Sequence, residues 1–432
     1  MRKFFILLVF FILIPSMVYS EIKEKILKNG LKVILFEDPS ATVATFQVWY
    51  KVGSIDEPEG KSGISHLLEH LMFRGSKNYP GNVFSKIIQT HGGIDNAFTT
   101  KDYTVYFQKL SKDNLKISID LESDRMENLL LLKEDFEVEK KIVMEERRQR
   151  YEDDPENLII EEVISTAFRN HPYRKPVIGW MEEIESISLE DIKNYYYQFY
   201  CPNNAFIIVA GNINSEEILD KVEEKFGSIS KCKLSSLFKN NYEPRQNGER
   251  RVVLKRKTHL PLLVMAYKVP AYPNKDSVSL ELLSTIVGEG KSSRLYRKLV
   301  QEKALAVDVT TSNSPLSRDG FLFFIVASVK DPQKIEEVER IIKEEIEKIK
   351  AETPSAKEIE KAKNQVEASF LFSQDSVFGY AIYLGKFEIL GSWKMINQYK
   401  EDILKIEAQD IQEVAKKYFN SENLTVGVLL PK

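Results

Sequence analysis

Residues 66–70 read HLLEH and lie within a longer segment, ISHLLEHLMF, at positions 64–73. The apolar residues of this segment recur at helical spacing and predict a helix face that points into a core: Ile64, Leu67, Leu68, Leu71 and Met72. His66, Glu69 and His70 then lie together on the other side, because residues three or four apart are neighbours on a helix. The segment therefore predicts a helix that presents two imidazoles and one carboxylate to a cleft.

The HLLEH segment matches the H-x-x-E-H pattern of the inverzincin peptidases. His66 and His70 lie one turn apart and can bind one metal ion, while Glu69 reaches the same pocket without being a ligand. Catalytic zinc takes three protein ligands and keeps a position for water, whose proton a nearby carboxylate can accept. The motif predicts one Zn²⁺ per chain. The alternative is a helix with two incidental histidines on its polar face.

The motif does not contain the third ligand that such a site needs. Three further histidines fit packing or surface positions better than a metal site: His91, His171 and His259. A charged helix predicted from Lys133 to about Tyr151 offers three carboxylates instead: Glu139, Glu145 and Glu146. Glu139 and Glu146 are two helical turns apart, so one could bind the metal while the other holds an imidazole in place. Spacing alone does not choose among the three, and a solvated charged face is the alternative.

Length and composition limit the classes of protein to which this chain can belong. A chain of 432 residues predicts two to three domains, and a hydrophobic content of 43% is sufficient for packed cores. The formal net charge of −3 creates no basic field. Nucleic acid is therefore excluded as an expected partner.

Residues 1–20 have the features of a signal peptide. Two basic residues precede an apolar run at positions 4–14, and Val18-Tyr19-Ser20 suits cleavage before Glu21. The run is short for a membrane span, and no second apolar run is long enough. We expect an exported protein, periplasmic or secreted, with no stable membrane span after signal cleavage. An uncleaved N-terminal anchor is the alternative.

The chain has two cysteines, Cys201 and Cys232. In an oxidising compartment they could form a disulfide. They could equally be small buried residues, and neither lies in a zinc-ligand spacing such as C-x-x-C.

Strand and helix patterns occur twice along the mature chain. Blocks of strands are followed by runs of helices, which predicts an α+β fold. Tyr50-Lys51-Val52 is echoed by Tyr267-Lys268-Val269, but the helical segment that follows the second copy contains no histidine. We therefore predict two homologous α/β-roll halves, each an antiparallel-rich sheet packed with helices. The expected boundaries are 21–227 for the zinc-bearing half, 228–250 for a linker and 251–432 for a half without metal ligands.

The HLLEH motif, followed by Glu146 76 residues after His70, resembles the pitrilysin/insulysin family of zinc peptidases. The resemblance is greatest to its mitochondrial-processing-peptidase-like branch. The segment EKKIVMEE at 139–146 is similar to the second ligand helix of that family, and GGIDNAFT at 92–99 is similar to its strand beside the site. The resemblance covers essentially the whole mature chain and is more specific in the first half.

This resemblance implies a role for each candidate residue. It implies that Glu69 is the general base, that Glu139 supports the site as a second acid, and that three residues bind the metal: His66, His70 and Glu146. It implies that an edge strand binds the substrate backbone by strand addition through Asn96, Ala97, Phe98 and Thr99. It further implies that two such chains close around a chamber that admits unfolded peptides.

One departure from the family pattern concerns its second half. Members that complete the site carry an Arg and a Tyr seven residues apart, where this chain has Val300 and Val307. Apolar side chains cannot donate hydrogen bonds to a developing oxyanion. Our hypothesis is that a homologous subunit supplies the Arg and Tyr, which makes a heterodimer, with a homodimer possible. The alternative is a shift of the alignment that gives the role to neighbours: Arg294, Tyr296 or Arg297.

The sequence thus predicts a zinc-dependent endopeptidase that acts as the metal-bearing subunit of a heterodimer. The first alternative is a non-catalytic structural subunit of the same fold. The presence of all four site groups argues against it, since such subunits typically lose the zinc motif. A zinc-binding module without hydrolysis is the second alternative, and Glu69 beside the two histidines argues against that one.

Overall fold

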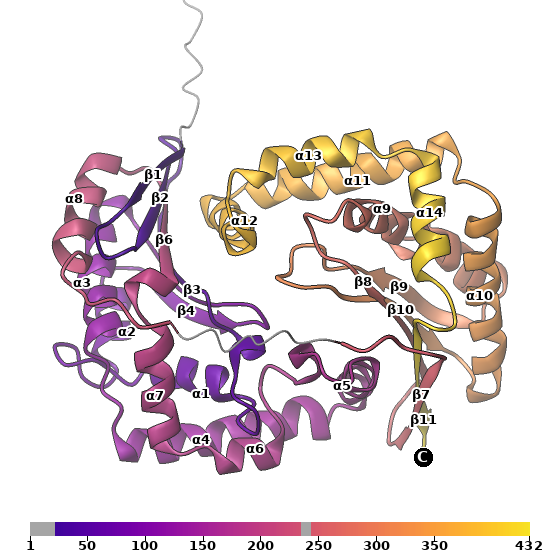
Figure 1. Ribbon diagram of the computed structural model, residues 1–432, viewed down its shortest axis with the longest axis horizontal. Coiled ribbons are helices and arrows are strands. Elements are labelled where there is room, and N and C mark those ends of the chain that lie inside the picture. Colours follow the sequence, from indigo (N-terminus) through magenta and orange to yellow (C-terminus); the bar gives the residue numbers. More distant parts are fainter. Residues whose placement is uncertain (1–21, 235–242) are drawn as a thin grey trace, which may run out of the picture.

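The computed structural model describes residues 22–234 and 243–432, and within them the chain forms two halves, each built on one sheet (Figure 1). The first sheet has six strands: β1 (Ile22–Ile26), β2 (Lys32–Glu37), β3 (Ala44–Tyr50), β4 (Ile94–Thr99), β5 (Thr104–Leu110) and β6 (Ala205–Gly211). The second sheet has five: β7 (Arg250–Arg256), β8 (Leu262–Val269), β9 (Ala306–Ser312), β10 (Phe321–Val329) and β11 (Leu424–Pro431).

The two sheets have the same strand order. The first runs β1-β2-β6-β3-β5-β4 and the second runs β7-β11-β8-β10-β9, so the second repeats the first without its outer strand β1. In each sheet the first and last strands of the repeat, β2 with β6 and β7 with β11, are parallel. All other pairs are antiparallel. The predicted fold of two homologous antiparallel-rich halves is therefore confirmed.

Helices surround both sheets. The first half contributes α1 (Ile64–Leu71), α2 (Val83–Thr90), α3 (Leu115–Glu127), α4 (Lys133–Arg147), α5 (Pro155–Ala167), α6 (Met181–Ser186), α7 (Leu189–Phe199) and α8 (Ser215–Phe226). The second contributes α9 (Asp276–Gly288), α10 (Ile335–Ala351), α11 (Ala356–Gln374), α12 (Val377–Leu390), α13 (Met395–Lys405) and α14 (Ala408–Tyr418). The charged helix expected to reach Tyr151 ends as α4 at Arg147 and continues as a wider turn over Arg148–Glu152. In helix α13 the buried residues Ile396, Tyr399 and Ile403 follow helical spacing.

One helix of each half packs against the sheet of the other half (Figure 1). Helix α5 packs on β7, β8 and β11 of the second sheet, and α12 packs on β3 and β6 of the first. Both contacts are close because a glycine lies at the crossing: a Cβ at Gly385 of α12 would lie 2.2 Å from the Trp49 ring, and one at Gly427 of β11 would lie 2.3 Å from Val163 of α5. The two halves are therefore joined by a shared hydrophobic core.

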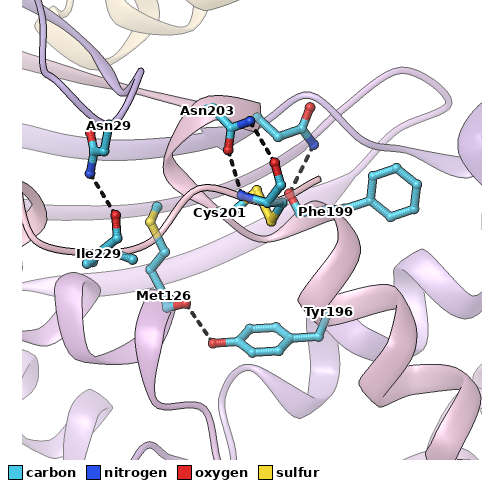
Figure 2. The surroundings of a disulfide bond; sticks show 9 residues. Asn29, Met126, Tyr196, Phe199, Cys201, Asn203 and Ile229 are labelled. Atoms are coloured by element: carbon cyan, nitrogen blue, oxygen red, sulfur yellow. Dashed lines mark hydrogen bonds between the residues drawn. A yellow bond between two sulfur atoms is a disulfide. The ribbon is translucent and has the colours of Figure 1, made fainter. Parts of the chain in front are cut away.

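A disulfide joins Cys201 to Cys232 across 31 residues (Figure 2). Asn203 braces the same junction, since its side chain accepts a hydrogen bond from the Cys232 N–H at 2.9 Å and donates one to the Cys232 carbonyl at 3.1 Å. A cross-link that closes a loop of this length stabilises a fold by about 3–4 kcal/mol in the chain-entropy model. The chain that leaves α8 is therefore tied back to the first half before it crosses to the second.

Two sequence predictions fall partly on residues that the structure does not describe. The predicted signal peptide, residues 1–20, and positions 235–242 of the predicted linker lie outside the described residues. Within 22–234 and 243–432, none of the helices combines the length and apolar composition that a membrane crossing requires.

Glu281 is a largely buried carboxyl on α9 in the second half. It lines a cavity of about 280 Å³ between α9, α11, α12 and α13, and it accepts a hydrogen bond from the Tyr399 hydroxyl at 3.1 Å. Burial raises the pKa of Glu281 from 4.5 to about 7, although the Tyr399 hydrogen bond opposes this shift. Between these two pKa values the folded protein binds more protons at this site than the unfolded chain does.

We expect the Glu281→Gln substitution to change how stability depends on pH. Because the pKa of Glu281 is raised in the folded state, its contribution to stability falls as pH rises from about 4.5 to 7 and is constant above that. The variant, which does not titrate there, should gain up to about 3 kcal/mol relative to the wild type over this interval. Urea unfolding from pH 4.5 to 8 measures the difference, with Glu367→Gln on the wall of the same cavity as control. Parallel curves for Glu281→Gln and wild type would contradict the expectation.

Candidate metal and catalytic site

Helix α1 carries the HLLEH segment and is fixed in two ways, by a buried apolar face and by a cap at its N-terminus. Leu67, Leu68 and Leu71 are fully buried in the core of the first half. The carboxylate of Glu57 accepts hydrogen bonds from the N–H groups of Gly63 and Ser65, both at 3.0 Å, and so caps the helix N-terminus. Burial raises the pKa of Glu57 to about 8, although these two N–H groups favour its charged form. Sequence reasoning missed Glu57, because a capping residue seven positions before the start of the helix carries no local signal.

The structure brings His66, His70 and Glu146 together. Their candidate ligand atoms lie within 4.8 Å of one another, and among residues 22–234 and 243–432 they form the single such group of three or more. The Glu146 Oε2 atom lies 3.4 Å from His70 Nε2 and 3.9 Å from His66 Nε2. The histidines come from α1 and the glutamate from α4, which packs against α1. The three histidines that the sequence assigned to packing or surface positions, His91, His171 and His259, are not part of this group.

The three carboxylates that spacing left open have different surroundings. Glu139 has a side chain only 5% exposed, and its Oε2 atom lies 2.9 Å from His70 Nδ1. Arg74 follows the end of α1, four residues after His70. Its guanidinium pairs with the other carboxylate oxygen of Glu139. Glu145 is 57% exposed and pairs with Arg148 at 3.1 Å. Glu146 therefore faces the histidines, Glu139 lies behind His70, and Glu145 faces solvent.

The charges of the site favour a neutral His66 and an anionic Glu146. Burial, followed by the neighbouring His70, lowers the pKa of His66 to about 4. The hydrogen bond with His70 lowers the pKa of Glu146. Burial by itself lowers the pKa of His70, but hydrogen bonds with Glu139 and Glu146 outweigh it and raise that pKa to about 9. Glu139 stays ionised beside it, because its bonds to His70 and Arg74 outweigh burial and lower its pKa.

Glu69 lies beside this group but makes a different contact. Its carboxylate accepts a hydrogen bond from the Thr99 hydroxyl at the end of β4. Burial raises the pKa of Glu69, and the Thr99 bond opposes this shift. A carboxylate with a raised pKa is a better proton acceptor at neutral pH than an exposed one. The sequence placed Thr99 among the substrate contacts and did not predict its bond to Glu69.

The strand that contains Asn96, Ala97, Phe98 and Thr99 is an edge strand. Within the described residues, β4 pairs with β5 alone, in antiparallel register from Ile94 opposite Lys109 to Thr99 opposite Thr104. Its other side leaves backbone N–H and C=O groups open to a further strand. Because Thr99 contacts Glu69, this open edge ends beside the candidate metal site.

Val300 and Val307 lie in the second half. Val300 belongs to the helical turn Tyr296–Glu302 and packs against the core of that half, and Val307 is 48% exposed on β9, the edge strand of the second sheet. Arg294, one of the alternative donors, is paired with Glu358 at 2.7 Å.

The donor set fits Zn²⁺. Two imidazole nitrogens and one carboxylate oxygen are the three protein ligands of a catalytic zinc site, which leaves a fourth position for water. The Glu139 contact with His70 Nδ1 is the hydrogen bond that orients a metal-binding imidazole and selects its tautomer. His66 Nδ1 is buried and has no hydrogen-bond partner among the described residues, whereas His66 Nε2 faces Glu146 Oε2 at 3.9 Å.

Comparisons with known proteins identify the family. The insulinase (peptidase family M16) model matches residues 32–180, and the peptidase M16 inactive domain model matches residues 186–366. The zinc protease PqqE of Helicobacter pylori is 35% identical over 408 residues, which cover 94% of this chain and 92% of that protein. This chain therefore belongs to peptidase family M16, the insulinase family. The resemblance to the pitrilysin/insulysin zinc peptidases is confirmed.

Other relatives agree with this assignment. The uncharacterized zinc protease YmxG of Bacillus subtilis is 26% identical, over 95% of this chain and 98% of that protein. The crystal structure of a protease from Helicobacter pylori superimposes with a TM-score of 0.90 at 34% identity, over 95% of this chain and 100% of that one. The first half of the periplasmic protease PqqL from Escherichia coli gives a TM-score of 0.78 at 18% identity, over 95% and 92% of the two chains, and shows the fold alone.

Proposed function

We propose that this chain is a zinc-dependent endopeptidase that hydrolyses unfolded peptides, with His66, His70 and Glu146 as metal ligands and Glu69 as general base. One observation carries the proposal: three ligand atoms lie within 4.8 Å of one another, and a fourth group, the largely buried carboxylate of Glu69, stands next to them. A zinc-binding module without hydrolysis has no need of that fourth group. Relatives of this chain that are named zinc proteases support the same proposal.

The residues of the site have distinct tasks in this proposal. When bound, Zn²⁺ acts as a Lewis acid that polarises a carbonyl oxygen and lowers the pKa of water to about 7. Glu69 accepts the proton of the attacking water and passes it to the leaving amine. Thr99 holds the Glu69 carboxylate in place through its hydroxyl, and Glu139 keeps the proton of His70 on Nδ1. The Glu139 carboxylate, fixed by Arg74, also balances positive charge that builds up on His70.

The substrate adds to the open edge of β4. An extended peptide that pairs with the backbone of Asn96, Ala97, Phe98 and Thr99 is carried along the strand to its end beside Glu69. Recognition of this kind reads the backbone, so it selects chains that can unfold and does not by itself select a sequence. A chamber closed by a second, homologous chain would exclude folded proteins.

The same proposal assigns the chain to a dimer outside the cytoplasm. Val300 and Val307 offer no hydrogen bond to an oxyanion, so a homologous subunit that bears Arg and Tyr at these positions completes the site, with a homodimer as the alternative assembly. The signal-like residues 1–20 support export to the periplasm or the exterior. The Cys201–Cys232 disulfide supports the same location, because disulfides persist in oxidising compartments.

We expect the purified mature chain, loaded with zinc, to cleave an unstructured quenched peptide slowly. Addition of a homologue that carries the Arg and Tyr but no zinc motif should raise turnover about 10²–10³-fold, the usual effect of one oxyanion donor. Fast Glu69-dependent cleavage by the chain alone would refute the need for a partner. Stoichiometric zinc without turnover in any combination would instead favour a zinc-binding module without hydrolysis, and failure to bind zinc would favour the non-catalytic structural subunit.

A further inference from the structure

A loop of the second half reaches across to the first half at one well-defined point. Arg318, in the loop between β9 and β10, forms a two-pronged ion pair with Asp56, with Nη1–Oδ2 at 2.7 Å and Nη2–Oδ1 at 3.3 Å. Its backbone N–H donates to Asp102 Oδ2 at 3.1 Å, and its Nη1 donates to the Asp102 carbonyl at 3.2 Å. Asp102 lies in the turn between β4 and β5, so equivalent turns of the two halves meet here.

Neighbouring residues reinforce this contact. The Tyr173 hydroxyl donates to Asp102 Oδ1 and accepts from the Asp319 N–H at 3.2 Å. The Asp319 carboxylate lies 2.9 Å from His171 Nε2. Asp56, Asp102 and Tyr173 are all buried, at 5%, 6% and 1% exposure. Arg318 is therefore the cation that offsets two buried acids of the other half.

The two segments that Arg318 holds lead directly to the candidate site. Asp56 closes the short helix Ser54–Asp56, and the next residue, Glu57, caps the N-terminus of α1. On the other side, Thr100 follows Thr99, whose hydroxyl binds Glu69. The two segments are also bonded to each other, since the Ser54 and Ile55 N–H groups donate to the carbonyls of Thr100 and Lys101 at 3.1 and 2.9 Å. A displacement at Arg318 would thus reach both α1 and the end of β4.

We propose that Arg318 is a positioning residue that sets the end of the substrate strand and the Thr99–Glu69 contact from the second half. The expected effect on kcat rests on the proposed peptidase function, whereas the expected effect on amide exchange does not. Arg318 lies in the second half, which contributes no candidate metal ligand within the described residues. Through Arg318, that half would influence the chemistry of the first half. Arg318 acts through its contacts with Asp56 and Asp102.

The test compares Arg318→Met with Arg251→Met as a matched control. Arg251 forms a similar two-pronged pair with Glu339, at 3.0 and 2.6 Å, but wholly inside the second half. In Arg318→Met we expect amide exchange at Thr100–Tyr103 and Gly63–Ser65 to rise about tenfold, while the zinc Kd stays within about threefold of wild type. In the complete enzyme kcat should fall about tenfold or more with little change in KM, because small displacements of a general base cost rate. Arg251→Met should leave exchange at these segments and kcat unchanged, and Arg318→Lys should restore only part of kcat, since lysine cannot form the fork.

Each outcome decides between positioning and plain stability. Unchanged exchange at Thr100–Tyr103 in folded Arg318→Met would overturn the proposal, as would equal effects of the two Met variants on exchange and kcat. If Arg318→Met does not fold, the double variant Asp56→Asn with Arg318→Met carries the same test without an unpaired Asp56. Absence of hydrolysis in the wild type would refute the proposed function, whereas the exchange comparison would still decide the role of Arg318.

Discussion

The Glu69→Gln variant should retain zinc and lose nearly all peptide hydrolysis. Glutamine keeps the size of the side chain and can still accept the hydrogen bond from Thr99, but it cannot accept a proton at neutral pH. Loss of a positioned general base typically costs 10²–10⁴-fold in rate, so we expect kcat to fall by about 10³-fold. Measurement of kcat on a quenched peptide, together with zinc content by elemental analysis, checks both parts.

The control for this prediction is Glu145→Gln. It makes the same chemical change on α4, one residue from the metal site, at a side chain that is 57% exposed. Its kcat should equal that of the wild type. Full activity in Glu69→Gln would remove Glu69 from the mechanism, and loss of zinc in that variant would make Glu69 a ligand instead of a base.

The Glu146→Gln variant should lose zinc. Its carboxylate oxygen lies 3.4 and 3.9 Å from the two histidine nitrogens, and an amide is a much poorer ligand than a carboxylate. Removal of a residue that only orients a ligand costs 10–100-fold in metal affinity, so loss of the ligand itself should raise the zinc Kd by more than about 100-fold. Competition with a chromophoric chelator measures this Kd.

The same titration on two neighbouring variants makes the assignment specific. Glu139→Gln should raise the zinc Kd by about 10–100-fold, because it weakens the hydrogen bond that orients His70. Glu145→Gln should have no effect. A larger loss in Glu139→Gln than in Glu146→Gln would reverse the roles that we assign to these two glutamates.

The helix that carries the candidate site was predictable because its signal is local. The periodicity of residues 64–73 placed Leu67, Leu68 and Leu71 in the core and His66, Glu69 and His70 opposite them, and the structure agrees. The repeat of strand blocks and helix runs likewise predicted two similar halves, which the matching strand orders confirm. Alternation and helical spacing depend on neighbours within a few residues, so both patterns can be recognised in the sequence before the fold is known.

Three features of this protein were decided by tertiary structure. The choice among Glu139, Glu145 and Glu146 depends on how α4 crosses α1, and rotation of one helix by a fraction of a turn would change which carboxylate meets the histidines. The packing of α5 on the second sheet and of α12 on the first depends on how the two halves come together, which neither helix sequence specifies. The pairing of Arg318 with Asp56 joins residues 262 positions apart.

Sequence by itself therefore determined the site helix, the side of it that carries His66, Glu69 and His70, and the two-part fold. Spacing left three glutamates open and the family resemblance pointed to Glu146, whose carboxylate the tertiary structure places beside the histidines. Tertiary structure alone established the Thr99 contact to Glu69 and the contact by which the second half holds the first. The physical reason is that a side chain's periodicity records which face is buried, but not what lies against that face. Partners distant in the chain meet only when separately formed elements pack, and burial then makes an unmatched charge costly enough to select its partner.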